Sequence, residues 1–266
     1  MIEYLILDYN RPTEARALLE SIKKYSRFNY SVTYLANGGE QDYAKQLREE
    51  GLIDNLILNS RNTGCGAGTI QLFAQCVTEF AFYIQVDHVL NYPIESSNID
   101  EFRRLLDTPD VRCIDLAGNQ GNPRGCYSER AQFINTAFYN SIPKSIGGPG
   151  PWKDMEWTEK SVQDFFKQNN FKILSIYTDQ KLPLFLDCGK YSIRSNPDGS
   201  EWKQQSDTKQ IWMLKPPTQQ FTWPHFSQAE WDKVLNTKSW PDGKIPEEML
   251  QHSFELPASY WPVNNL

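Results

Sequence analysis

Four short segments of this chain place polar or small residues directly after apolar runs, where they are free to meet a ligand. These segments are residues 8–12, 36–39, 59–68 and 85–88. A strand that ends on a carboxylate, as at Asp87, suits a hard divalent cation, whose shell is completed by phosphate oxygens. Small residues before a helix, as at Gly64 and Gly66, expose backbone amides that suit an anion such as a diphosphate. The alternative for each segment is an ordinary turn between a strand and a helix.

A fifth segment, residues 147–157, holds carboxylates just before an expected helix. It is too rich in Gly and Pro for regular structure and leads into an expected helix. Two carboxylates, Asp154 and Glu156, precede that helix. One role for Asp154 is structural, because the helix dipole stabilises a carboxylate at a helix start.

The elements that must position these segments alternate between short apolar runs and amphipathic stretches. Strands are expected at 4–7, 32–35, 56–58, 81–86, 111–116, 132–139 and 172–177, and helices at 15–22, 43–50, 67–79, 98–106 and 158–169. Asn10 and Asn98 are the expected N-caps of the first and fourth helices. This alternation predicts an α/β fold with a mainly parallel sheet flanked by helices. In such a sheet ligands lie at the carboxyl ends of the strands, where the first four segments fall.

The composition changes along the chain. All eight tryptophans and most of the sixteen prolines lie in the second half. We therefore expect a main domain over residues 1–177 and a Trp- and Pro-rich C-terminal flank or lid, packed on it, over residues 178–266. With 39% hydrophobic and 23% charged residues, the chain has the composition of a folded protein.

Charge and hydropathy narrow the class of protein. The formal net charge of −6 and the pI near 5.2 disfavour nucleic-acid binding through a broad basic surface. No apolar run has the length of a membrane span, and the N-terminal residues lack the features of a signal peptide. The five scattered cysteines form no C-x-x-C pair, which argues against a disulfide framework or a zinc knuckle. The expectation is a cytoplasmic protein without a membrane span.

In their order and spacing, the five segments resemble the family-2 glycosyltransferases of the GT-A fold. The stretches that carry the resemblance are LILDYNRP, LANGG, NSRNTGCGAG, AFYIQVDH and GGPGPWKDMEW, which span roughly residues 2–175. The resemblance implies a GT-A-like catalytic domain and an inverting enzyme. Such an enzyme moves a sugar from a nucleotide-diphosphate donor, here most simply a UDP-sugar, to an acceptor hydroxyl. It also implies Mg²⁺ or Mn²⁺ as cofactor.

The resemblance assigns roles to particular residues. Those expected around the nucleotide and its phosphates are Tyr9, Asn10, Arg11, Asn37, Arg61, Asn62, Gly64, Gly66, Gln85 and Asp87. Asp87 matches the second acid of the family's Asp-x-Asp motif and is the expected metal ligand, with the late histidine His225 as another. Asp154 falls on the catalytic base, and Glu156 is the fallback.

Three departures from the family pattern leave other functions open. Gln85 replaces the first acid of the Asp-x-Asp motif, Ala36 stands where an acid often lies near the donor base, and Lys153 replaces the first acid of a late pair. These changes would suit a non-catalytic sugar- or nucleotide-binding module. A sugar-phosphate nucleotidylyltransferase shares the architecture, but residues 8–12 are not its Gly-rich loop. The acceptor is expected among glycans, lipid-linked sugars, proteins and hydroxylated DNA bases, and the net charge disfavours the last.

Overall fold

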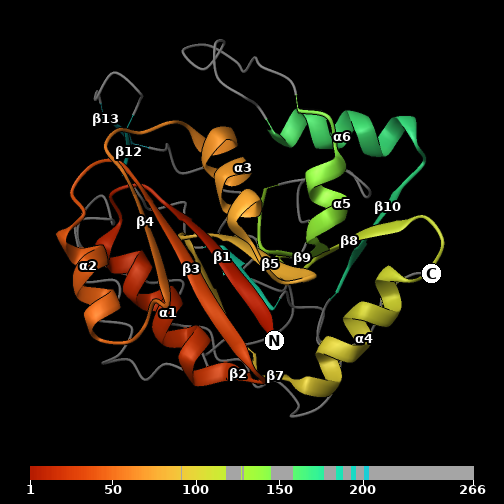
Figure 1. Cartoon of the computed structure of the whole chain (residues 1–266), viewed down its shortest axis with the longest axis horizontal. Helices are drawn as coiled ribbons and strands as arrows, with labels where there is room; N and C mark the ends of the chain where they lie inside the picture. Colours follow the sequence, from red (N-terminus) through yellow and green to blue (C-terminus); the bar gives the residue numbers. More distant parts are fainter. Residues whose placement is uncertain are drawn as a thin grey trace, which may run out of the picture.

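A seven-stranded sheet forms the centre of the molecule (Figure 1). The computed structural model describes residues 1–90, 92–117, 127, 129–144, 158–176, 184–187, 193–195 and 201–203. Across the sheet the strands are β10 (Lys172–Ser175), β8 (Val111–Asp115), β9 (Gln132–Asn135), β5 (Phe80–Gln85), β1 (Ile2–Asp8), β3 (Tyr30–Asn37) and β4 (Asn55–Asn59). β9 runs antiparallel to its neighbours, and every other pairing in this sheet is parallel. The predicted α/β fold with a mainly parallel sheet is confirmed.

Helices cover both faces of this sheet (Figure 1). On one face lie α1 (Pro12–Tyr25), α2 (Asp42–Glu49) and α4 (Ser96–Leu106), and on the other α3 (Cys65–Gln75), α5 (Thr136–Ser141) and α6 (Thr158–Gln168). Successive residues of β1 point to opposite faces, so Tyr4 and Ile6 pack with α1, whereas Leu5 and Leu7 pack with α3. Every residue of β1 is buried, which explains its nearly unbroken apolar sequence.

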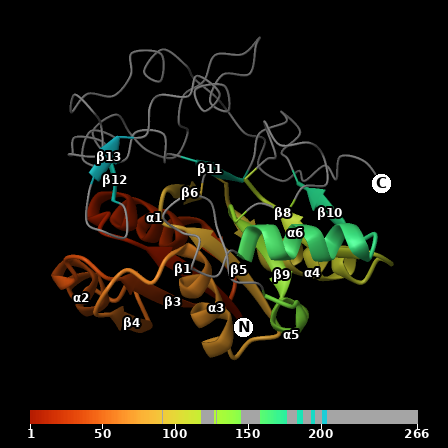
Figure 2. The same cartoon turned by 90° about the horizontal axis from the view of Figure 1, so that it is seen from above.

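Three two-stranded ladders supplement the main sheet. β6 (His88–Leu90) pairs antiparallel with β11 (Phe185–Asp187), beside which it lies in Figure 2. β2 (Ser26–Arg27) pairs with β7 (Ile94–Glu95), and β12 (Ile193–Ser195) pairs with β13 (Glu201–Lys203). β11 therefore joins a piece of the expected C-terminal flank to the main domain. The boundary near residue 177 stays a prediction, because most of the flank lies outside the described residues. No helix in the described ranges could cross a membrane.

One predicted strand is wrong in its second half. The expected strand at 132–139 ends at Asn135, and α5 follows at once. The side chain of Asn135 accepts a 2.9 Å hydrogen bond from the backbone N–H of Phe138, which caps the new helix. The third helix also begins earlier and ends earlier than expected, at Cys65–Gln75.

Neither predicted asparagine cap is at the N-cap position. Arg11 precedes α1, with Pro12 in its first turn, and Asn10 adopts a left-handed conformation with φ 55°. Asn98 lies inside the first turn of α4, where its Oδ1 accepts a 2.7 Å hydrogen bond from the backbone N–H of Glu95. It therefore caps from within the helix, as the third residue of a capping box does.

The strand order places a topological switch point between β1 and β5. From β1 the chain proceeds outward to β3 and β4 on one side, and then returns to β5 on the other side of β1. α1 leaves β1 on one face, and α3 enters β5 from the opposite face. In open sheets of this kind, ligands bind in the crevice outside the carboxyl ends of the two strands that flank the switch point. The loops after β1 and β5 therefore border the candidate site, which we call the switch crevice.

Candidate functional site at the switch point

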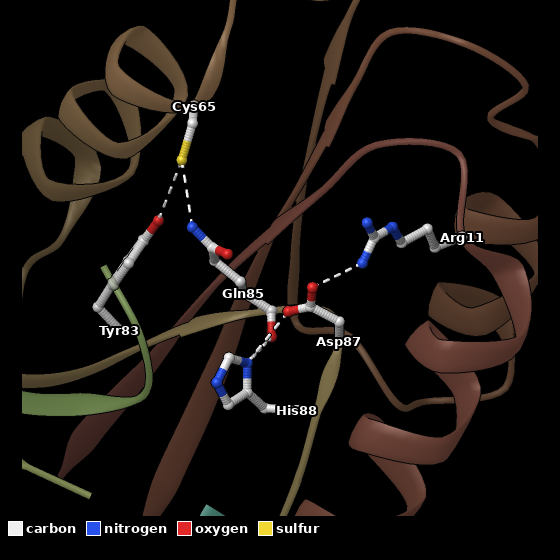
Figure 3. Close-up of polar contacts among 6 residues, drawn as sticks. All are labelled: Arg11, Cys65, Tyr83, Gln85, Asp87 and His88. Carbon is white, nitrogen blue, oxygen red and sulfur yellow. Dashed lines mark hydrogen bonds and ion pairs between the residues drawn. The ribbon is translucent and has the colours of Figure 1, made fainter. Parts of the chain in front are cut away.

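An ion pair joins the loop after β1 to the loop after β5. Nη1 of Arg11 donates a 2.7 Å hydrogen bond to Oδ2 of Asp87 (Figure 3). Only 12% of the Arg11 side chain and 4% of the Asp87 side chain are exposed. Burial lowers the pKa of Arg11, but the negative charges of Asp87 and Glu14 outweigh it, and the pKa ends above its ordinary value. The guanidinium is therefore a permanent positive charge at the switch crevice.

His88 holds the other side of Asp87. Its Nδ1 lies 3.1 Å from Oδ1 of Asp87 and 3.2 Å from the backbone oxygen of Gln85. Both partners are acceptors, so Nδ1 carries the proton. The two carboxylate oxygens of Asp87 thus each have a protein partner, and the loop from Gln85 to His88 is closed on itself (Figure 3).

Asn37, at the end of β3, supports the loop between β4 and α3. Its Oδ1 accepts hydrogen bonds from the Asn59 side chain at 2.9 Å and from the backbone and hydroxyl of Thr63 at 3.1 and 2.8 Å. Its Nδ2 donates to the backbone oxygen of Gly64 at 3.0 Å and to Asn62 Oδ1 at 3.2 Å. Only 1% of Asn37 is exposed, so its side-chain amide makes its hydrogen bonds within the protein. Its expected contact with a nucleotide stays a prediction.

Glycines let the loops after β3 and β4 touch backbone to backbone. Gly38 has φ 91°, and a Cβ added there would lie 2.4 Å from the backbone nitrogen of Asn62 and 2.5 Å from the backbone carbon of Arg61. Gly64 has φ 88°, and its N–H donates a 2.8 Å hydrogen bond to Oδ1 of Asn62. Only glycine adopts such φ values without strain. This close backbone contact therefore adds to the hydrogen bonds of Asn37 in fixing the loop.

The N-terminus of α3 approaches the end of β1. A Cβ added to Gly68 would lie 2.6 Å from Cδ1 of Leu7, so the helix packs closely on the strand. In the described structure, no side chain caps this N-terminus and its first turn holds no acidic residue. The first amides of a helix have no partner within the helix, and they attract anions. Gly66 belongs to this first turn.

Cys65, the first residue of α3, links the helix to β5 and to Glu129. Nε2 of Gln85 donates to Sγ of Cys65 at 3.3 Å, and the thiol donates to Oε2 of Glu129 at 2.9 Å. The hydroxyl of Tyr83 lies 4.0 Å from the same sulfur (Figure 3). Burial raises the pKa of Glu129 to about 7, and the carboxylate of Glu159 adds to the rise. Removal of the sulfur from water and the charge of Glu129 raise the pKa of the Cys65 thiol, although the residue as a whole is exposed, and the thiol therefore stays protonated.

Asp8 is another buried carboxyl at the crevice, at the end of β1. Its Oδ2 accepts hydrogen bonds from the hydroxyls of Tyr34, at 2.6 Å, and of Tyr43. Its Oδ1 has no hydrogen-bond partner within the described part of the chain. Burial raises the pKa of Asp8, and the two tyrosine hydroxyls oppose that rise.

The structure brings all ten residues expected around the nucleotide and its phosphates to one edge of the sheet. Tyr9, Asn10 and Arg11 follow β1, Asn37 ends β3, and Arg61, Asn62, Gly64 and Gly66 lie between β4 and the first turn of α3. Gln85 ends β5, and Asp87 follows it. Three further predicted residues lie outside the described residues: Asp154 and Glu156, the candidate bases, and His225, the candidate metal ligand.

Sequence reasoning missed Asp8, Cys65 and Glu129 as site residues. Asp8 and Cys65 stand inside segments that the pattern singled out, yet an acid at a strand end and an isolated cysteine carry little signal alone. Glu129 precedes an expected strand, and its place beside Cys65 depends on a contact between residues 64 positions apart. Local sequence gives no sign of that contact.

The described residues do not by themselves fit a divalent cation. Asp87 is the one predicted ligand among them, and its oxygens are already bonded to Arg11 and His88. A guanidinium paired with the carboxylate repels a second cation. Within the described ranges, no group of three His, Cys, Asp or Glu residues is arranged to hold a metal ion. Binding of Mg²⁺ or Mn²⁺ stays a prediction that needs a rearrangement of Arg11 or ligands elsewhere in the chain.

Comparison with known proteins finds likeness only in structure. No protein-family model and no curated protein matches the sequence. S. aureus TarS 1–349 in complex with UDP-GlcNAc has 14% identity and a TM-score of 0.43, and the match covers 61% of this chain and 53% of that chain. The mannosyltransferase PcManGT from Pyrobaculum calidifontis, in complex with GDP-Man and Mn²⁺, has 10% identity and a TM-score of 0.48, with 65% of this chain and 53% of that chain covered.

This chain thus matches about half the length of each of these solved proteins. The likeness is partial, with identities below 25% and TM-scores below 0.5. Membership of family 2 stays a prediction. The function proposed next therefore rests on this chain's own residues.

Proposed function

We propose that this chain is a glycosyltransferase that moves a sugar from a nucleoside diphosphate donor to an acceptor hydroxyl, with inversion at the anomeric carbon. One observation carries the proposal: a buried, fixed guanidinium, that of Arg11, lies at the switch point of the sheet. Its hydrogen bond to Asp87 sets its place, and Gln85 connects the same loop to the first residue of α3. Arg11 and the first amides of α3, which no side chain caps in the described structure, offer a diphosphate positive charge from two elements.

The transfer reaction requires positive charge near the donor diphosphate. When the acceptor oxygen attacks the anomeric carbon, the bond from that carbon to the donor phosphate breaks and its electron pair stays on the diphosphate. Groups already aimed at the place where negative charge develops stabilise the transition state without reorganising. Arg11 meets this requirement because Asp87 and burial restrict its side chain.

A nucleoside is expected against the loops after β3 and β4. Asn37, Asn62 and Gly64 hold the backbone of the β4–α3 loop in one conformation. A rigid loop lowers the conformational entropy lost on binding, which favours affinity. We place the nucleoside there, next to Tyr9 and Asn10, and the diphosphate between Arg11 and α3.

The acceptor hydroxyl needs a base. We propose Asp154 for this role, with Glu156 as the second candidate, because a carboxylate must take the proton as the acceptor oxygen forms its bond. Both precede α6, which packs against α3 in the described structure. A divalent cation, predicted from the family resemblance, would supply further charge to the diphosphate when bound, but its ligands would have to come from elsewhere in the chain or from Asp87 after Arg11 has moved.

One observation favours a second candidate function. Asp87 is already paired with Arg11, and Gln85 stands where the family has an acid. These features suit a module that binds a nucleotide sugar without transferring it. The two functions share donor binding and differ in turnover.

Isothermal titration calorimetry with a panel of nucleotide sugars tests the shared step. UDP-GlcNAc and GDP-mannose begin the panel, because they are the donors present in the two solved structures. Arg11→Gln should weaken binding of the preferred donor by about 10-fold or more, since it removes a charge-assisted contact to phosphate. Arg16→Gln is the matched control, because Arg16 lies on α1, which begins directly after Arg11 in the chain, but pairs with the exposed Glu50. Equal donor affinity in wild type and Arg11→Gln would overturn the placement of the diphosphate.

A further inference from the structure

Within the cluster of Cys65, Gln85 and Glu129, the proposed reaction gives no task to Cys65 or Glu129. Glu129 is 7% exposed, and its Oε1 is buried without a hydrogen-bond partner in the described residues. The cluster lies at the carboxyl end of β5, two residues before Asp87. The buried carboxyl of Glu129 is linked through the thiol of Cys65 to Gln85 at the switch crevice. This link to the candidate site indicates a role beyond packing.

We infer that Cys65 and Glu129 are positioning residues that fix the amide of Gln85, so that its oxygen accepts a hydrogen bond from a hydroxyl of the bound donor. This inference rests on the proposed function, because it specifies a contact within the same site.

The direction of the hydrogen bonds follows from the chemistry of each group. An ionised carboxylate only accepts, so the thiol of Cys65 must donate its single proton to Glu129. The sulfur then has only lone pairs for Gln85, and it accepts from Nε2 at 3.3 Å. The amide oxygen of Gln85 consequently points away from the sulfur (Figure 3). A charged acceptor strengthens such a chain, because each hydrogen bond polarises the next.

The backbone of Gln85 is held as well. Its carbonyl oxygen accepts from Nδ1 of His88, the residue that also contacts Asp87. Side chain and backbone of Gln85 are therefore restrained from opposite sides, by Cys65 and by His88. Fixing one end of a hydrogen-bonding side chain lowers the entropy lost when a ligand engages the other end.

Protonation of Glu129 would reverse the direction of the hydrogen bonds that run from Gln85 through Cys65 to Glu129. A neutral carboxyl can donate to the sulfur, the thiol must then find another acceptor, and the amide of Gln85 turns to offer its oxygen. Several groups face Glu129: Cys65 from α3, Glu159 from α6, Tyr83 from β5 and Tyr127. Burial raises the pKa of Glu129 to about 7, the Cys65 thiol opposes that rise, and the Glu159 carboxylate adds to it. Donor affinity should therefore increase as the pH rises through about 7.

The experiment measures the side chain of Gln85 and the donor affinity separately. In ¹⁵N-labelled full-length protein, the side-chain amide signals of Gln85, assigned through Gln85→Asn, should shift with a midpoint near pH 7. Glu129→Gln should abolish that titration. Cys65→Ala should remove it, and Cys65→Ser should restore part of it, because a hydroxyl also donates and accepts. Cys76→Ala, at the other end of α3, is the control and should leave the titration unchanged.

Donor binding is then measured by calorimetry at pH 6 and pH 8 with the preferred nucleotide sugar, whose diphosphate diester does not titrate in this range. Wild type should bind about 3- to 10-fold tighter at pH 8, which is the scale of one hydrogen bond, and Glu129→Gln should show no such change. An amide titration without any donor binding would sink the proposed function and leave the chain of hydrogen bonds standing. Gln85 signals that respond to pH identically in wild type and Glu129→Gln would overturn the positioning role. Equal pH dependence of donor affinity in both proteins would overturn it too.

Discussion

Arg11 and Asp87, 76 residues apart in the sequence, form a 2.7 Å ion pair across the switch point between β1 and β5. The pair exists because β1 lies between β3 and β5, so that the loops after β1 and β5 are neighbours. It holds the Arg11 guanidinium in one place at the crevice. It also occupies the carboxylate that a divalent cation would need.

Arg11 and Mn²⁺ should therefore compete for Asp87. Arg11→Gln removes the competing charge, so the affinity for Mn²⁺ should rise by about 5- to 10-fold, and Asp87→Asn should abolish this gain. Electron paramagnetic resonance of free Mn²⁺ measures the affinity without any donor. Weaker Mn²⁺ binding by Arg11→Gln than by wild type would contradict the competition.

The effects of substituting Arg11 and Asp87 on the free energy of unfolding should be strongly coupled. Asp87→Asn leaves Arg11 buried without its counter-charge and should lower the free energy of unfolding by about 3 kcal/mol. In the double variant with Arg11→Gln, part of that loss should be recovered, because no uncompensated charge remains. Urea unfolding of the four proteins gives the coupling. Additive losses would show that the two side chains act independently.

Asn37 should matter more for stability than its size suggests. Asn37→Ala removes the side chain that joins the end of β3 to Asn59, Thr63 and Gly64, and should lower the free energy of unfolding by about 2 to 3 kcal/mol. Asn29→Ala, at an exposed position before β3, should change it by less than about 0.5 kcal/mol. Thermal and urea unfolding compare the two. Similar small losses would mean that the loop is held by its backbone alone.

Alanine substitutions at two glycines distinguish backbone strain from steric clash. Gly38 and Gly51 have φ 91° and 71°, so alanine is strained at both positions. A Cβ at Gly38 meets the backbone of Arg61 and Asn62, whereas a Cβ at Gly51 meets nothing within 4 Å. Gly51→Ala should destabilise by about 1 to 2 kcal/mol, and Gly38→Ala should destabilise more and also weaken donor binding. Equal effects on stability and on binding would refute the close approach of the two loops.

The raised pKa of Glu129 predicts the direction in which stability changes with pH. Its pKa is raised from 4.5 to about 7 in the folded protein, so in this range the folded state binds more protons than the unfolded state. Stability relative to Glu129→Gln should therefore be greatest below pH 4.5 and fall as the pH rises to about 7. Urea unfolding across this range measures the difference. A flat difference between the two proteins would show that Glu129 is not buried in this way.

Much of the fold could be predicted because periodicity and turn residues act locally. The sequence shows the alternation of strands and helices, and it shows polar residues at the ends of β1, β3 and β5. These two features predicted the edge of the sheet at which the polar residues meet. The end of β9 at Asn135 was missed, because one capping side chain outweighed an apolar run that continues to Tyr139. The pairing of Arg11 with Asp87 was missed for another reason: a basic residue in one loop and an acid in another are joined only by the strand order.

Release of nucleoside diphosphate from the preferred nucleotide sugar is the most direct test of sugar transfer by this chain. The acceptor panel contains sugars, lipid-linked sugars, peptides and hydroxymethylated DNA, and proton NMR of the product gives the anomeric configuration. We predict release with inversion in the wild type. Asp154→Asn should reduce turnover by about 10²-fold or more without changing donor affinity, and Glu156→Gln should stay active. A wild-type protein that binds the donor yet releases no diphosphate with any acceptor would contradict this prediction and identify a binding module.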